Sequence, residues 1–191
     1  MNSVLAEKKL VILDRDGVIN EESPHYIKSL AEWHPIPGSL EAMAALTQAG
    51  IRIAIVTNQS GIGRGLFTEA VLKEINDTLI KKVESLGGRV DVIFYCPHVP
   101  ADHCTCRKPG VGLLNKVSEY FQLDLTQVPY IGDSEKDMLA AQKKQCQGML
   151  VETGYGKTVS SEWIQKAAIP VYKNLKAAVA ALLSEELPSW P

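Results

Sequence analysis

The chain has 191 residues, of which 46% are hydrophobic and 22% are charged, and its formal net charge at pH 7 is −2. These values are typical of a globular domain and argue against a disordered chain, while the longest apolar runs are too short to span a membrane. No cluster of Lys and Arg exceeds two residues, which argues against nucleic-acid or membrane-surface partners.

We therefore expect one domain over residues 1–191 that acts as a monomer on a small molecule. The segment 1–9 is polar and leads into a short apolar run, unlike a signal peptide, so we expect a cytoplasmic location. There are no internal repeats or low-complexity tracts that would indicate another architecture.

Five short apolar runs, rich in β-branched residues, recur along the chain. Their continuous hydrophobicity predicts strands that are buried on both faces, as in a parallel sheet covered by helices. The runs are residues 10–13, 51–56, 90–95, 128–131 and 147–151.

Helical patterns separate these runs. Ser39 is expected to cap a helix over 40–49, and Thr68 another that ends at Gly87 and Gly88. A third covers about 113–121, a fourth begins at Ser134 with Asp137 three residues later, and a fifth covers 174–187. This alternation predicts an α/β fold with a doubly wound, mainly parallel, Rossmann-like sheet.

Two further segments, one connection and one tail, complete this expectation. The connection 21–37 is long enough to close over a site, but no segment is long enough to form a separate cap domain. Residues 188–191 are expected to be a frayed tail.

In such a sheet, ligands bind at the carboxyl ends of the strands, so the residues after each run carry the functional signal. The first motif is Asp14-Arg15-Asp16-Gly17, in which two carboxylates lie two residues apart beside a glycine that permits a sharp turn. Both carboxylates can serve one reaction centre. By itself the motif is more often explained by a turn or a helix cap.

Three further motifs follow strands in the same way. Thr57 to Ser60 offer hydroxyl, amide and backbone N–H donors for phosphate oxygens, and Arg107-Lys108-Pro109 offers two cations before a helix. Asp133 and Asp137 lie at a strand end and in the next helical turn. Each has an ordinary explanation as a polar loop, a solvated pair or a cap, but all four at one sheet edge form a specific combination.

In this order the four motifs resemble the haloacid dehalogenase superfamily of aspartate-dependent phosphohydrolases, from Leu13 to Asp137. The resemblance implies a phosphatase in which Asp14 attacks phosphorus and forms an aspartyl phosphate. Asp16 would protonate the leaving oxygen and then activate water.

The same resemblance implies a magnesium ion. Oxygens of Asp14, of the Asp16 carbonyl and of Asp133 would bind Mg²⁺, which prefers oxygen ligands. Thr57 and Lys108 would hold the phosphoryl oxygens while charge redistributes.

Three of the four cysteines lie close together in the sequence, with histidines among them. Cys96, His98, Cys104 and Cys106 provide a closed tetrahedral set typical of structural Zn²⁺. His103 is a rival ligand, but it is adjacent to Cys104 and would need a strained loop. A disulfide or free buried thiols are the alternatives, and Cys146 stands apart as a packing residue.

This zinc loop narrows the resemblance to the histidinol-phosphatase-like branch. Within it, segments 13–20, 26–29, 57–65 and 104–109 resemble the D-glycero-D-manno-heptose 1,7-bisphosphate 7-phosphatases, whose product feeds ADP-heptose for the lipopolysaccharide core. One departure is Ser134, where some members have a lysine. Histidinol-phosphate phosphatases are the alternative, followed by a non-catalytic phosphosugar-binding module, against which the presence of both Asp14 and Asp16 argues.

The expected substrate contacts surround the four motifs. Arg107 is the first candidate for gripping a second phosphate, because a guanidinium can bind phosphate with two parallel hydrogen bonds. The full set is Glu22, His25, Tyr26, Thr57, Asn58, Gln59, Ser60, Arg64, Arg107 and Lys108.

Overall fold

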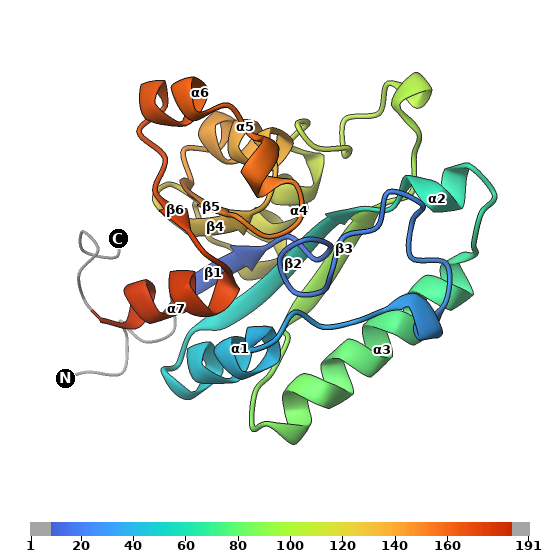
Figure 1. Ribbon diagram of the computed structural model, residues 1–191, viewed down its shortest axis with the longest axis horizontal. Helices are drawn as coiled ribbons and strands as arrows, with labels where there is room; N and C mark the ends of the chain where they lie inside the picture. Colours follow the sequence, from blue (N-terminus) through green and yellow to red (C-terminus); the bar gives the residue numbers. More distant parts are fainter. Residues whose placement is uncertain (1–8, 185–191) are drawn as a thin grey trace.

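The computed structural model describes residues 9–184, which contain a six-stranded sheet in the order β3-β2-β1-β4-β5-β6 (Figure 1). All neighbouring strands in it run parallel. The strands are β1 (Leu10–Leu13), β2 (Arg52–Asn58), β3 (Val92–Cys96), β4 (Pro129–Gly132), β5 (Gln147–Val151) and β6 (Val171–Tyr172). The predicted doubly wound parallel sheet is therefore confirmed.

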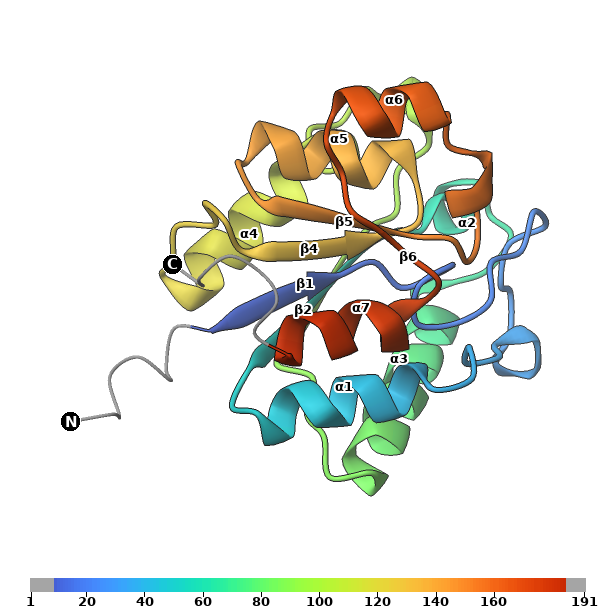
Figure 2. The same ribbon diagram turned by 60° about the vertical axis from the view of Figure 1, so that its left-hand side comes forward.

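Helices cover both faces of the sheet. Figures 1 and 2 show α1, α3 and α7 on one face and α4 and α5 on the other. The helices are α1 (Ser39–Gln48), α2 (Ser60–Gly63), α3 (Glu69–Ser85), α4 (Gly112–Phe121), α5 (Glu135–Lys143), α6 (Ser161–Lys166) and α7 (Leu175–Leu183). In the described part of the chain, three short 3-10 turns lie at Leu30–Glu32, Pro100–Asp102 and Gly156–Thr158. Over residues 9–184, no helix combines the length and the apolar character that crossing a membrane requires.

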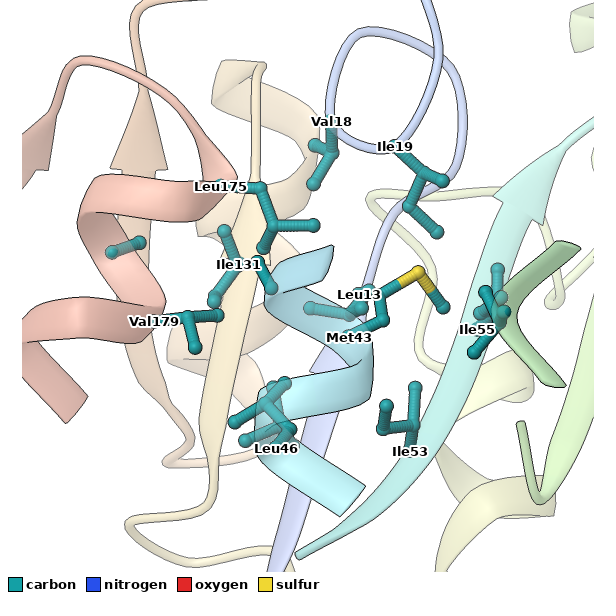
Figure 3. Close-up of a cluster of buried hydrophobic side chains, with 14 of the residues drawn as sticks. Leu13, Val18, Ile19, Met43, Leu46, Ile53, Ile55, Ile131, Leu175 and Val179 are labelled. Atoms are coloured by element: carbon teal, nitrogen blue, oxygen red, sulfur yellow. The ribbon is translucent and has the colours of Figure 1, made fainter. Parts of the chain in front are cut away.

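The two faces of the sheet have separate cores, because side chains alternate along each strand. Val11 and Leu13 of β1 join the cluster under α1, α3 and α7, whereas Leu10 and Ile12 join the cluster under α4 and α5. Figure 3 shows the first cluster, in which Val18 and Ile19 of the loop after β1 reach the same core. Burying such a side chain is worth about 1.5–3 kcal/mol, so these two residues anchor the loop that carries Asp16.

The helix starts agree with the sequence at two of three predicted caps. The side chains of Thr68 and Ser134 accept hydrogen bonds from the first turns of α3 and α5. Ser39 is a correction: Gly38, at φ 84°, is the cap, and Ser39 is the first helical residue. Its hydroxyl instead donates to the Ile19 carbonyl at 2.6 Å, which ties α1 to the loop after β1.

Other differences concern short or peripheral elements. Three elements, α2, α6 and β6, were not predicted because they are too short to show a periodic pattern. The last predicted helix begins as expected at Asn174, which caps α7, but residues 185–187 and the predicted frayed tail 188–191 lie outside the described residues.

The connection 21–37 divides into two parts. Ile27 and Trp33 are buried in the core, and the Ile36 amide donates to the Ile19 carbonyl at 2.9 Å. Glu22, Pro24 and Tyr26 line the main cavity instead. The segment therefore borders the site while its second half is held against the core.

Candidate active site

A cavity of about 810 Å³ lies at the carboxyl ends of β1, β2 and β4. Because these central strands are parallel and adjacent, the residues that follow them meet at one edge of the sheet. Asp14, Asp16, Thr57, Lys108 and Asp133, which come from all four predicted motifs, line this cavity. The structure therefore brings the four motifs together.

Lys108 lies buried between two carboxylates at the base of the cavity. Its Nζ is 2.8 Å from Asp14 Oδ1 and 2.6 Å from Asp137 Oδ1, and it donates to the Val56 carbonyl at 3.0 Å. Burial opposes the charge on Lys108, but Asp137 and Asp14 outweigh it and raise the pKa of the ammonium. The lysine is thus a fixed cation, 3% exposed, aimed at Asp14.

Three carboxylates share this space. Oxygens of Asp14, Asp133 and Asp137 lie within 4.8 Å of one another. Burial raises the pKa of Asp14 well above its usual range despite Lys108, with Asp137 and Asp133 adding to the rise. Burial and Asp137 likewise raise the pKa of Asp133 to about 7. One lysine does not balance three carboxylates, so this oxygen-rich site fits a divalent cation such as Mg²⁺.

Two glycines make room for the carboxylate of Asp133. Gly17 (φ +80°) and Gly154 (φ +56°) approach it so closely that a Cβ on either would lie 2.0 Å from Asp133 Oδ2. The same oxygen accepts a hydrogen bond from the Tyr155 amide at 2.8 Å. The glycine of the first motif therefore serves close packing against Asp133 as well as the turn.

Asp16 accepts hydrogen bonds from three side chains. Arg15 donates to both oxygens, from Nε at 2.8 Å and Nη2 at 3.0 Å, while Asn20 donates to Oδ1 at 2.9 Å and Gln59 to Oδ2 at 2.8 Å. Burial opposes ionisation, but Arg15 and these hydrogen bonds outweigh it and lower the pKa of Asp16. These surroundings therefore favour the carboxylate form of Asp16.

Arg15 and Asn20, for which no role was predicted, hold this site together with Asp137 of the fourth motif. Arg15 is completely buried and also donates to Asn76 of α3 at 3.3 Å. Asn20 donates to Asp16, and Asp137 of the fourth motif both takes part in the cap of α5 and pairs with Lys108. An arginine between two aspartates at a strand end was a signal, since a buried arginine needs a carboxylate partner.

The two side-chain amides of the second motif are hydrogen-bonded to other groups of the protein. Asn58 accepts from the Lys108 amide at 3.0 Å and donates to the Lys108 carbonyl at 3.2 Å. Gln59 Nε2 donates to Thr57 Oγ1 at 2.9 Å as well as to Asp16. Thr57, Asn58, Gln59 and Ser60 all line the cavity.

The outer predicted contacts divide into two groups. Glu22, Tyr26 and Arg107 line the cavity, whereas His25 and Arg64 are exposed and do not line it. Burial, followed by the charge of Asp16, raises the pKa of Glu22 to about 7. The structure therefore does not bring His25 and Arg64 to the cavity wall.

The thiols of the predicted zinc loop lie together with one imidazole. Cys106 Sγ is 3.2 Å from Cys96 Sγ, 3.5 Å from Cys104 Sγ and 3.2 Å from His98 Nδ1. Zn–S bonds of about 2.3 Å would place tetrahedral sulfur ligands about 3.8 Å apart, so the four residues fit this metal after small adjustments. The sulfurs are too far apart for disulfides, which need about 2.05 Å, and all four cysteines of the chain are free.

His103 does not belong to this cluster, which contains Cys96, His98, Cys104 and Cys106. It adopts a left-handed conformation with φ 46° at the end of the 3-10 turn Pro100–Asp102. Of the two candidate histidines, His98 is the one that the structure places beside the thiols.

Comparison with known proteins assigns the family. The family model of haloacid dehalogenase-like hydrolases matches residues 5–151. The chain belongs to this family. This hydrolase is 46% identical to the D-glycero-beta-D-manno-heptose-1,7-bisphosphate 7-phosphatase of Pseudomonas aeruginosa over 92% of this chain and 98% of that protein. It is 32% identical to the enzyme of the same name from Escherichia coli, over 94% and 96%.

Solved structures agree with these relatives. The hydrolase superposes with a TM-score of 0.88 on D,D-heptose 1,7-bisphosphate phosphatase from B. bronchiseptica, crystallised with magnesium and phosphate. The two chains are 43% identical, and the match covers 93% of this chain and 99% of that one. The corresponding enzyme from Burkholderia thailandensis gives a TM-score of 0.70 at 35% identity, over 93% and 100%.

Proposed function

We propose that this hydrolase removes the C7 phosphate of D-glycero-beta-D-manno-heptose 1,7-bisphosphate. The observation that carries the proposal is the buried Asp14–Lys108 pair at the base of the cavity, 2.8 Å apart. It lies in a chain whose relatives with this activity in their names match it over nearly their whole length. We propose with it the role in ADP-heptose formation that this activity implies.

In the first half of the reaction, an Asp14 oxygen attacks phosphorus and forms the aspartyl phosphate. The bond between phosphorus and the C7 oxygen breaks, and Asp16 gives that oxygen a proton. Asp16 must lose one of its N–H donors before it carries this proton, because four N–H contacts occupy its oxygens. Proton donation therefore requires a small movement around Asp16.

In the second half, water attacks the aspartyl phosphate while Asp16 takes a proton from it. The bond between phosphorus and the Asp14 oxygen breaks, which releases inorganic phosphate and restores Asp14. The surroundings of Asp16 lower its pKa and so favour the carboxylate form, which this step uses.

Lys108 and Thr57 would bind the phosphoryl oxygens throughout, because both line the cavity beside Asp14. Asp14, the Asp16 carbonyl and Asp133 would hold Mg²⁺, and Asp137 would keep Lys108 in place. Bound Mg²⁺ neutralises charge on the phosphoryl oxygens. Arg107, at the cavity wall, would bind the second phosphate.

We further propose that Cys96, His98, Cys104 and Cys106 bind a structural Zn²⁺. The set has no open position for a substrate, and the loop leads directly to Arg107 and Lys108. Metal analysis of the purified protein should find about one zinc per chain. A zinc-free protein with disulfide-bonded cysteines would exclude this site.

The wider setting follows from the same features. We propose one domain without a separate cap, acting as a monomer in the cytoplasm. The cavity is built at the edge of a single sheet, and four free cysteines suit a reducing compartment.

The function is tested by phosphate release from a substrate panel with and without Mg²⁺. The panel contains heptose 1,7-bisphosphate, histidinol phosphate and hexose monophosphates, and ³¹P NMR identifies the phosphate that is lost. We expect the heptose bisphosphate to be the best substrate and to retain its C1 phosphate. Faster release from histidinol phosphate would overturn the substrate assignment, and no release from any member would overturn the phosphatase assignment.

A further inference from the structure

The side chain of Gln59 lies between two groups that the proposed reaction uses. Its Nε2 is 2.8 Å from Asp16 Oδ2 and 2.9 Å from Thr57 Oγ1, and the residue is 4% exposed. We infer that Gln59 is a positioning residue that orients the Asp16 carboxyl and the Thr57 hydroxyl together. This inference rests on the proposed phosphatase function and deepens it.

The chemistry of the partners determines which end of the amide faces them. An ionised carboxylate only accepts hydrogen bonds, so the group that faces Asp16 must be the NH₂ of Gln59. Both N–H bonds are then used, one on Asp16 and one on Thr57. Gln59 has no N–H left in its side chain for a phosphate oxygen, which differs from the direct substrate contact that we expected from the sequence.

The contact with Thr57 determines where the hydroxyl hydrogen of Thr57 can point. Because the Thr57 oxygen accepts from Gln59, its own O–H is free to donate to another group. Thr57 lines the cavity beside Asp14, and the oxygens of a phosphate dianion only accept. Gln59 therefore makes the Thr57 hydroxyl a donor toward the phosphoryl group.

The contact with Asp16 links the acid to this phosphate-facing group. Of the three side chains that donate to Asp16, Arg15 and Asn20 are completely buried and do not line the cavity. Gln59 does line it. The orientation of the carboxyl toward the leaving oxygen thus depends on the same amide that orients the Thr57 hydroxyl.

The backbone keeps Gln59 in this position. The backbone N–H of Gln59 donates to the Cys96 carbonyl at 2.7 Å, which joins the end of β2 to the Cys/His loop. The side-chain amide of the preceding residue, Asn58, is also hydrogen-bonded within the protein, but its partner is the backbone of Lys108. Asn58 is therefore a matched control: it is a neighbouring amide that does not touch the acid.

The test compares two leaving groups. A sugar alkoxide needs a proton from Asp16 to leave, whereas p-nitrophenolate leaves readily without one. The value of kcat/KM reports only steps through the first bond cleavage. For Gln59→Met we expect kcat/KM to fall about 10- to 100-fold on heptose bisphosphate and at least about fivefold less on p-nitrophenyl phosphate, since a general acid contributes about 10²–10⁴-fold. For Asn58→Leu we expect similar losses on both substrates.

A double mutant identifies the residue through which Gln59 acts. In an Asp16→Asn background there is no acid to orient, so adding Gln59→Met should leave the ratio of the two kcat/KM values unchanged. If Gln59→Met does not fold, as judged by its thermal transition, Gln59→Leu replaces it, because it also removes both N–H donors without placing a second carboxylate beside Asp16.

Equal losses from Gln59→Met on both substrates would overturn the inference while leaving the proposed function intact. The same holds if the substitution changes the ratio in the Asp16→Asn background. If the wild-type protein hydrolyses neither substrate, the proposed function fails, and the positioning role fails with it.

Discussion

The carboxylate–lysine centre and the Cys/His loop are both candidate metal sites, but they are built in opposite ways. Asp14, Lys108, Asp133 and Asp137 come from segments far apart in the chain and are buried. Cys96, at the end of β3, and His98, Cys104 and Cys106, in the loop that follows it, come from one short segment, and of these four only Cys96 is buried. The first centre depends on the order of strands in the sheet, whereas the second depends mainly on local spacing.

This difference separates chemistry from support. In the first centre the fold buries several carboxylates together. Burial, and then the charges of neighbouring carboxylates, raise the pKa values of Asp14 and Asp133, so the site favours a bound cation. In the second, four ligand atoms that fit one Zn²⁺ lie just before Arg107 and Lys108. Damage to the first should remove the reaction itself, and damage to the second should misplace residues that assist it.

The largest effect should come from the nucleophile. Asp14→Asn should lower kcat by at least about 10⁴-fold, since removing a nucleophile costs on this scale, while zinc content and the thermal transition remain close to wild type. Steady-state kinetics and metal analysis check this together. Activity above about a hundredth of wild type would contradict the covalent mechanism.

Removing the buried cation should affect both stability and rate. Lys108→Met leaves Asp14 and Asp137 without their shared partner, and breaking a buried ion pair costs about 3–5 kcal/mol of unfolding free energy. Urea denaturation measures this loss. It should shrink at low pH, where protonation neutralises Asp14, whose folded-state pKa is raised. A pH-independent loss would mean that packing, not charge, dominates.

A smaller, substrate-dependent effect is expected at the cavity wall. Arg107→Ala should cost about 2–3 kcal/mol in kcat/KM on heptose bisphosphate, the scale of a charged hydrogen-bonded contact, and much less on a monophosphate. Measuring both substrates with both proteins isolates the second phosphate. Equal losses would place Arg107 at the reacting phosphate instead.

Breaking the loop should act indirectly. Cys104→Ala should remove zinc and lower activity about tenfold or more by loosening the segment before Arg107, since structural zinc contributes on the order of 10 kcal/mol in small peptide sites. Cys146→Ala is the control, because Cys146 lies outside the cluster. The loop is not a metal support if the Cys104 variant keeps its zinc and its activity.

The smallest expected effect concerns Glu22, whose pKa is raised from 4.5 to about 7 by burial and by Asp16. A raised folded-state pKa means that stability is present below pH 4.5 and is lost as the pH rises toward 7. Glu22→Gln removes this loss, so the metal-free variant should be more stable than wild type at pH 8 by less than about 2 kcal/mol, because solvent screens the partly exposed side chain. Equal stabilities of the two proteins at pH 8 would show that ionisation of Glu22 does not destabilise the fold.

Sequence patterns alone were sufficient where the signal is local. The strands at 10–13 and 147–151 have the predicted bounds, because continuous apolar runs indicate burial on both faces. The order of the four motifs also predicted one shared edge, because parallel strands bring their carboxyl ends together. The close spacing of three cysteines and His98 likewise predicted the cluster that the structure contains.

The tertiary structure determines which hydrogen-bond and ion-pair partners the side chains of the site have. The sequence predicted Lys108 as a phosphoryl contact but not its partners: Lys108 is buried between Asp14 and Asp137 because distant strands place these carboxylates around it. Gln59 reads as a phosphate contact, yet its amide is used on Asp16 and Thr57. Spacing along the chain indicates which residues reach an edge of the sheet, whereas the donor that faces each acceptor depends on packing between segments that the sequence places far apart.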